Sequence, residues 1–164
     1  MKNRPATRDT ALRAQLIELL RGGHAHATFD QVVRGFPLDR IGLRPEGAPH
    51  SAWELLEHMR IAQNDILRFS QSADYVSPKF PEGYWPTAAA PERAGQWQAS
   101  IRAFRRDLSE FEKMVLDPAQ NLHRKFPWGD GQTLLREALL IADHNAYHLG
   151  QLVLVRRLLG AWRA

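Results

Sequence analysis

The most informative stretch of this sequence lies near its C-terminus and runs Ala142-Asp143-His144-Asn145-Ala146-Tyr147-His148-Leu149-Gly150-Gln151. It belongs to a longer segment, residues 133–159, that is rich in Leu, Ala and Val. This composition predicts one continuous helix, with Gly160 well placed as the residue just past its end. His144 and His148 are four residues apart, so the helix places both on one face, with Cβ atoms about 6 Å apart.

That face is also the apolar side of the predicted helix. One stripe contains the two histidines and four apolar residues: Ile141, His144, His148, Leu152, Val155 and Leu159. Such a stripe is expected to face the core. A core imidazole needs partners for its ring nitrogens, because an unsatisfied buried polar group costs about 1–3 kcal/mol. The pair therefore indicates either hydrogen-bonded core histidines or part of a metal site.

A third inward histidine is predicted on another helix. Ser51-Ala52-Trp53-Glu54 is a capping box that predicts a helix start, and the helix should continue to about residue 70. Its inner stripe is Leu55, His58 or Met59, Ala62, Ile66 and Phe69. Three imidazoles from two helices suit a zinc-like ion, which then keeps a fourth position for water or substrate. The remaining histidines are assigned to solvent-facing or capping roles: His24, His26, His50 and His123.

Two more helical segments complete the pattern. Residues 10–21 form one, with Thr7 or Asp9 as its N-cap, and after Gly22-Gly23 residues 25–34 either continue it with a kink or form a second short helix. Pro91 is placed in the first turn of another helix, about residues 92–116. Four long helical segments without strand-like alternation predict an all-α fold, a four-helix bundle.

The connection at residues 71–91 bears on topology. It is long and rich in prolines and aromatic residues. Such a crossover allows the second and third helices to run the same way, which predicts an up-down-down-up bundle. The aromatic pair Tyr84-Trp85 is expected to plug one end of the bundle, with a pocket wall over the metal as the alternative.

Composition limits the class of protein. With 164 residues and 44% hydrophobic content, the chain is expected to form a single domain, residues 1–164. It has no cysteine, and no signal sequence or long apolar run is found, so a cytoplasmic protein without membrane contact is expected. The net charge of +4 is spread among acidic residues, so no nucleic-acid partner is expected. The densest basic positions are interpreted as solvated helix faces or helix C-termini: Arg102, Arg105, Arg106, Arg156, Arg157 and Arg163.

Two segments carry a resemblance to a known family. Ser51-Ala52-Trp53-Glu54-Leu55-Leu56-Glu57-His58-Met59 and Asp143-His144-Asn145-Ala146-Tyr147-His148-Leu149-Gly150-Gln151 resemble the two signature regions of the DinB/YfiT-like superfamily, and the likeness extends over about residues 8–160. The resemblance implies an up-down-down-up four-helix bundle, in which His58, His144 and His148 bind a divalent ion such as nickel, zinc, iron or manganese. It also implies a homodimer, and an apolar surface would suit helix pairing: Leu149, Leu152, Val153, Leu154 and Val155.

The resemblance further implies thiol transfer with bacillithiol or mycothiol, thiol-dependent isomerisation, or metal-dependent hydrolysis. A metal-dependent transferase that uses a low-molecular-weight thiol on a small-molecule substrate is the leading hypothesis. A divalent ion in an all-imidazole site lowers the pKa of a bound thiol, and a chain without cysteine must take that thiol from a cosubstrate. Arg60 or Arg68 is a candidate to receive the carboxylates of this thiol.

Two alternatives stay open. A hydrolase would need a general base, and Glu57 and Asp143 point about 100° away from the neighbouring histidines on their helices. Asn145, Tyr147 and Gln151 are better placed to contact the ligands or the substrate, and no catalytic residue is assigned. The second alternative is a non-catalytic, dimeric metal-binding module, in which a fourth protein ligand fills the last coordination position of the ion.

Overall fold

The computed structural model describes the backbone of residues 4–162 and the side chains of residues 9–162, and no strand occurs among them. Four of its helices are long. The elements are α1 (Arg4–Arg21), α2 (Phe29–Val33), α3 (Ala52–Gln71), the 3-10 turn η1 (Glu82–Tyr84), α4 (Gln96–Leu116) and α5 (Leu134–Leu158). The predicted all-α bundle is confirmed.

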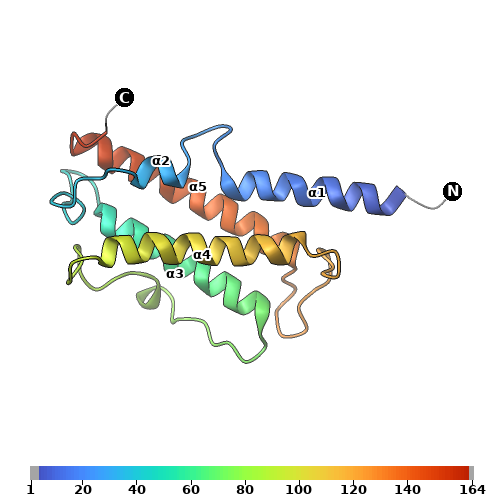
Figure 1. Cartoon of the computed structure of the whole chain (residues 1–164). Coiled ribbons are helices and arrows are strands. Elements are labelled where there is room, and N and C mark those ends of the chain that lie inside the picture. The colour runs from blue at the N-terminus through green and yellow to red at the C-terminus, as the bar shows by residue number, and fades with distance from the viewer. Residues whose placement is uncertain (1–3, 163–164) are drawn as a thin grey trace.

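The long helices run in two directions (Figure 1): α1 and α5 one way, α3 and α4 the other. Polar contacts agree with the picture. Gln63 of α3 donates to the carbonyl of Phe104 in α4 at 2.8 Å and accepts from Asn145 of α5 at 2.9 Å. His58, one turn earlier on α3, meets His148, one turn later on α5, so these two helices are antiparallel. The connection after α3 therefore returns along the bundle before α4 begins.

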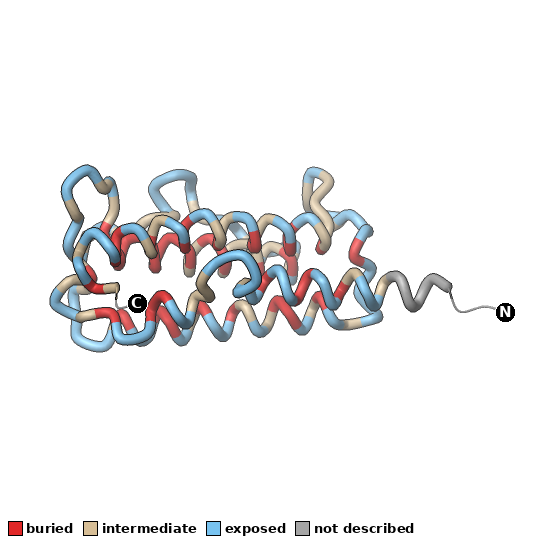
Figure 2. Tube along the Cα trace, turned by 90° about the horizontal axis from the view of Figure 1, so that it is seen from above, coloured by how far each residue is buried: buried red, intermediate tan, exposed pale blue. Residues whose placement is uncertain are grey.

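The core lies between the facing sides of the helices. Figure 2 shows the buried residues along these sides and the exposed ones outside. One apolar cluster, with Met59, Phe104 and Leu149, fills the end near α2, and a second, with Leu67 and Phe111, fills the end near α1. The Gln63–Asn145 hydrogen bond lies between the two clusters, because Gln63 falls between Met59 and Leu67 along α3. None of the helices in the described part of the chain is long and apolar enough to cross a membrane.

Both predicted signals at helix ends are confirmed. Ser51 Oγ accepts from the Glu54 backbone N–H at 3.2 Å, while Glu54 Oε2 accepts from the Ser51 N–H at 2.8 Å. At the end of α5, Gly160 has φ +63° and the Ala161 N–H reaches the Arg156 carbonyl at 2.9 Å. This left-handed closure fixes where α5 stops.

Two predicted helix starts near the N-terminus are wrong. Because α1 begins at Arg4, Thr7 and Asp9 lie inside it rather than at its N-cap. The left-handed backbone at Gly22 (φ +67°) and Gly23 (φ +95°) ends α1. The following helix is short and starts at Phe29, where Thr28 forms its own capping box.

The start of α4 is also later than predicted. Gly95 has φ +83° and is the residue before the helix, which begins at Gln96 instead of residue 92. Pro91 therefore precedes the helix by several residues and is not in its first turn. The turn is closed by Gln96, whose N–H bonds to the Arg93 carbonyl at 3.4 Å and whose Oε1 accepts from the Arg93 N–H at 2.9 Å.

The predicted pairing surface on α5 is wrong in its composition. Leu149, Leu152 and Val155 are buried in the core, whereas Leu154 is 57% exposed. Residues three or four apart share a helix face, whereas neighbours in sequence point about 100° apart, so Leu154 cannot form one surface with the buried Leu149, Leu152 and Val155. The homodimer stays a prediction.

Arg156 lies in the last turn of α5, as predicted for a helix C-terminus, but it is buried rather than solvated. Its Nε donates to the Ala161 carbonyl at 2.9 Å and its Nη1 donates to the Val32 carbonyl, while the guanidinium lies over the rings of Phe36 and Trp162. It ties α2 to the end of α5. Arg163, from the same basic group, lies outside the described residues.

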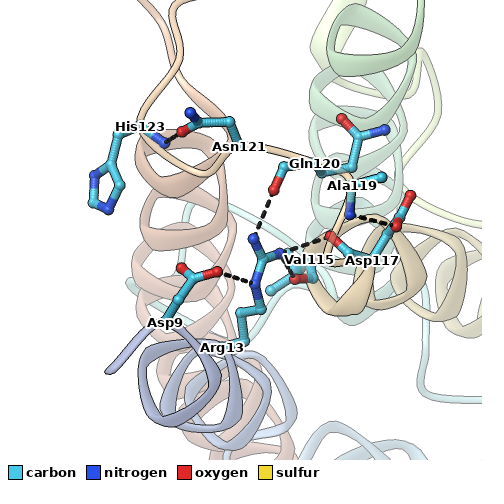
Figure 3. Close-up of polar contacts among 8 residues, drawn as sticks. All are labelled: Asp9, Arg13, Val115, Asp117, Ala119, Gln120, Asn121 and His123. Carbon is cyan, nitrogen blue, oxygen red and sulfur yellow. Dashed lines mark hydrogen bonds and ion pairs between the residues drawn. The ribbon is translucent and has the colours of Figure 1, made fainter. Parts of the chain in front are cut away.

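A second buried arginine closes the end of α4 (Figure 3). Arg13 of α1 donates to the carbonyls of Val115, Asp117 (3.0 Å) and Gln120 (2.6 Å), and its Nε pairs with Asp9 Oδ2 at 2.9 Å. The last carbonyls of a helix have no partner within the helix. Arg13 donates hydrogen bonds to carbonyls at this helix end and thereby joins α1 to α4.

Replacing Arg13 with methionine is expected to lower the free energy of unfolding by about 2–3 kcal/mol, because buried carbonyls lose charged donors. Urea unfolding followed by circular dichroism measures the change. Arg102→Met, at an exposed position on α4, is the control and should change stability by less than about 0.5 kcal/mol. Equal effects in the two variants would show that the Arg13 contacts contribute nothing specific.

Candidate metal centre

Three ring nitrogens meet between α3 and α5. Nε2 of His58 lies 3.0 Å from Nε2 of His144 and 3.1 Å from Nε2 of His148. One ligand atom from each of the three rings lies within 4.8 Å of the other two. The structure therefore brings together all three histidines singled out from the sequence.

Hydrogen bonds on the far side of two rings decide where their protons are. Nδ1 of His58 lies 2.9 Å from the carbonyl oxygen of Tyr84, and Nδ1 of His148 lies 2.7 Å from Oε1 of Gln151. Both oxygens only accept, so each Nδ1 carries the proton and each Nε2 of the neutral ring presents a lone pair. Two lone pairs facing at 3.1 Å repel each other unless a cation lies between them.

The spacing fits a divalent metal ion. Nitrogen ligands at about 2.0–2.1 Å from one ion lie about 2.9–3.4 Å from each other, for angles between about 90° and 109°. The separations of His58 Nε2 from His144 Nε2 and from His148 Nε2 both fall in this range. Imidazole nitrogen suits zinc, iron and nickel, so the donor set agrees with the predicted class of metal.

The surroundings keep the three rings neutral. Burial, together with the nearby His148 and His58, lowers the pKa of His144 to about 4. Burial is also the main cause that lowers the pKa of His58 and the pKa of His148. A histidine must be unprotonated to bind a metal, and these three are in that form at neutral pH.

Trp85 forms one wall of the site. Its ring lies parallel to His58 at 3.9 Å between centroids, with an interplanar angle of 1°. His50 stacks on it at 4.1 Å, and since two rings cannot share one face, His50 lies on the opposite side. The aromatic connection thus lies against the three-histidine site, and Trp85 also packs on the apolar cluster near α2, as expected of a plug. It also assigns His50, expected to face solvent or cap a helix, to the surroundings of the site.

Tyr84 fastens this wall to α3 at two points. Its main-chain oxygen orients His58, and its hydroxyl donates to Asp65 Oδ2 at 2.6 Å. Burial and the Asp65 carboxylate raise the pKa of Tyr84, and the same two causes raise the pKa of Tyr75 to about 12. Both phenols therefore stay protonated, which maintains the Tyr84 hydrogen bond at neutral pH.

The three polar residues near the histidines on α5 have different surroundings. Gln151 holds His148 through Nδ1. Tyr147 is 65% exposed, and its ring meets the His148 ring edge-on at 4.9 Å. Asn145 is buried and donates to Gln63 on α3, so its amide nitrogen is committed to the bundle interior.

The charged residues considered for the site are paired elsewhere or exposed. Glu57 is held by Arg60 through two hydrogen bonds of 2.8 Å. Asp143 is exposed, and Arg68 donates to Gln71 at 3.3 Å. Neither carboxylate is placed as a general base, and Arg60 is paired within its own helix.

Replacing Gln151 with methionine should weaken metal binding about 10–100-fold, because His148 loses the acceptor that fixes its tautomer and orientation. Competition with a zinc chelator measures the affinity. Asp143→Asn is the control on the same helix, at an exposed position, and should leave the affinity unchanged. An unchanged affinity in Gln151→Met would mean that the hydrogen bond does not orient a ligand.

A sequence model of the DinB superfamily matches residues 23–152, a range that starts after α1 and includes all three histidines, Trp85 and Gln151. No curated protein and no solved structure matches the chain.

Proposed function

We propose that this protein, which belongs to the DinB superfamily, is a divalent-metal-dependent enzyme that transfers a low-molecular-weight thiol to a small-molecule acceptor. The observation that carries the proposal is the convergence of three neutral imidazoles on one point between α3 and α5. His58, His144 and His148 would hold the ion, with nickel, zinc, iron and manganese as the candidates.

The composition of the cluster favours an enzyme over a structural metal site. Within the described part of the chain, the group contains three histidines and neither a carboxylate nor a fourth histidine. Three protein ligands leave a coordination position for a water or a substrate. In such a position the ion lowers the pKa of the thiol or water that it binds.

The protein's own residues prepare the site. Tyr84 and Gln151 hold the protons of His58 and His148 on Nδ1, which keeps both Nε2 atoms free for the ion. Trp85 covers one face of His58 and keeps water from that side. The sulfur must come from a cosubstrate, because the chain has no cysteine.

A hydrolase is the second candidate, since the same ion would activate water. It has less support, because Glu57 is bound to Arg60 and Asp143 is exposed. The hypothesis of a non-catalytic dimeric module is weaker than before, because most of the predicted pairing surface lies in the core.

Calorimetry on zinc-loaded protein tests the proposal. Glutathione, mycothiol and bacillithiol are titrated, each beside its S-methyl derivative, which lacks the ionisable thiol. At least one free thiol should bind about tenfold more tightly than its derivative and release a proton, and metal-free protein should show no such preference. Equal binding of all the pairs would contradict thiol transfer, and metal-dependent hydrolysis of an ester would then favour the hydrolase.

A further inference from the structure

We infer that a recess between α2 and the end of α5 binds a small molecule through a phosphate or carboxylate group. The two helices lie side by side at this end of the bundle (Figure 1). The recess has a volume of about 890 Å³, within the range of about 300–1,000 Å³ that is typical of small-molecule sites. The lining residues that carry the inference are Arg34, Arg40, Arg156 and Trp162.

The recess is separate from the candidate metal centre. None of the three histidines lines it. Arg156 follows His148 by eight residues on α5, which places it about 12 Å further along the helix and about 80° around its axis. The inference therefore does not depend on the proposed metal-dependent function.

The lining of the recess is positively charged. It includes three arginines and neither aspartate nor glutamate. The acidic residues that flank Arg34 and Arg40 in sequence are directed elsewhere, because Asp30 pairs with Arg105 of α4 and Asp39 lines a different cavity. Within the described part of the chain, none of the three arginines forms an ion pair. An anion is therefore the ligand that complements this lining.

Arg156 is buried without a counter-ion. It is 7% exposed, and burial lowers the pKa of its guanidinium with no carboxylate acting against that effect. The pKa of Arg21, by contrast, is raised by the hydrogen bond and the charge of Glu112. Buried charges in proteins are normally paired. An anion in the recess would supply the missing negative charge.

The arginines keep N–H groups that a ligand can use. Arg156 donates from Nε and Nη1 to main-chain carbonyls, which leaves Nη2. Arg40 donates from Nη1 to the Leu159 carbonyl at 2.6 Å, and the exposed Arg34 makes no side-chain hydrogen bond to a described residue. A guanidinium has five N–H groups in a planar fork that matches two oxygens of a carboxylate or phosphate. Capping of the helix ends therefore accounts for only some of these donors.

An NMR titration of isotope-labelled protein tests the site, with inorganic phosphate and citrate as separate probes and sodium chloride of equal ionic strength as the reference. The Trp162 ring lies 5.4 Å from the guanidinium carbon of Arg156, so its indole N–H signal reports on the recess. It should shift saturably with at least one probe. The probe that binds more tightly shows whether the site prefers a phosphate or a carboxylate.

Variants locate the binding. Arg34→Gln and Arg40→Gln should each weaken it at least about fivefold, because each removes a charged donor. Arg102→Gln is the matched control, since it removes the same charge from an exposed position on α4, and it should bind as the wild type does. His148→Ala should also bind as the wild type does, because the recess does not include the metal centre.

Four results would overturn the inference. The first is an indole signal that responds to neither probe beyond its response to chloride. The second is equal weakening in Arg102→Gln and Arg34→Gln, which would reduce the effect to net charge. The third is loss of binding in His148→Ala, which would place the anion at the metal. The fourth is sedimentation with anionic phospholipid vesicles without binding of either free anion, which would assign the arginines to a lipid surface.

Discussion

His148→Ala is expected to lose tight metal binding, whereas the wild type should carry about one divalent ion per chain. His148 supplies one of only three nitrogens that converge in the described site. Loss of a hydrogen-bond partner behind a ligand weakens binding about 10–100-fold, and loss of the ligand itself should cost more. Elemental analysis of protein purified without an affinity tag measures the content, and chelator competition measures the affinity.

His123→Ala is the matched control, because His123 is an exposed loop histidine whose side chain points away from its neighbours (Figure 3). It should retain the wild-type metal content. A His148→Ala protein with a full ion per chain would place the metal elsewhere. If the wild type takes up no nickel, zinc, iron or manganese, the three histidines are core residues without a metal. The proposed metal-dependent enzyme would then have no support.

The features that the sequence predicts well are encoded within single helices. The stripe with His144 and His148 and the stripe with His58 follow from helical periodicity, which depends only on spacing. The capping box at Ser51 is likewise local, four residues long. That these two stripes face each other follows from packing two apolar faces in one bundle. The convergence of the three rings could therefore be predicted from the sequence.

The features that the sequence predicts poorly depend on backbone conformation or on contacts between segments that are far apart in the chain. The late start of α4 follows from a left-handed Gly95, and the sequence gives no sign of φ at a glycine followed by a good helix former. The stack of His50 on Trp85 joins two loops that are far apart in the chain. Neither loop has a periodic pattern, so no local signal connects them.

The metal-free protein is expected to lose stability on acidification between about pH 6.5 and pH 4. Burial holds the pKa of His144 at about 4, below its ordinary value of 6.5. In this window His144 is protonated in the unfolded chain but stays neutral in the folded chain, so lowering the pH favours unfolding. The contribution of His144 is complete above pH 6.5 and is lost as the pH falls. Its size, reduced for partial exposure, is about 2–3 kcal/mol, and His58 and His148 act in the same direction.

Urea unfolding at pH 7, 5.5 and 4 measures this dependence, and the comparison that matters is between slopes. Carboxylates such as Glu54, whose pKa is lowered by the hydrogen bond and charge of Arg44 against the cost of burial, also reduce stability in acid. They do so equally in wild type and in His144→Asn, so the difference between the two slopes reports His144 together with its coupling to His58 and His148. The variant should lose about 2–3 kcal/mol less than wild type, and His123→Asn should match wild type. Parallel curves for wild type and His144→Asn would mean that the His144 ring accepts a proton in the folded protein as easily as in water, which is incompatible with a buried, neutral metal ligand.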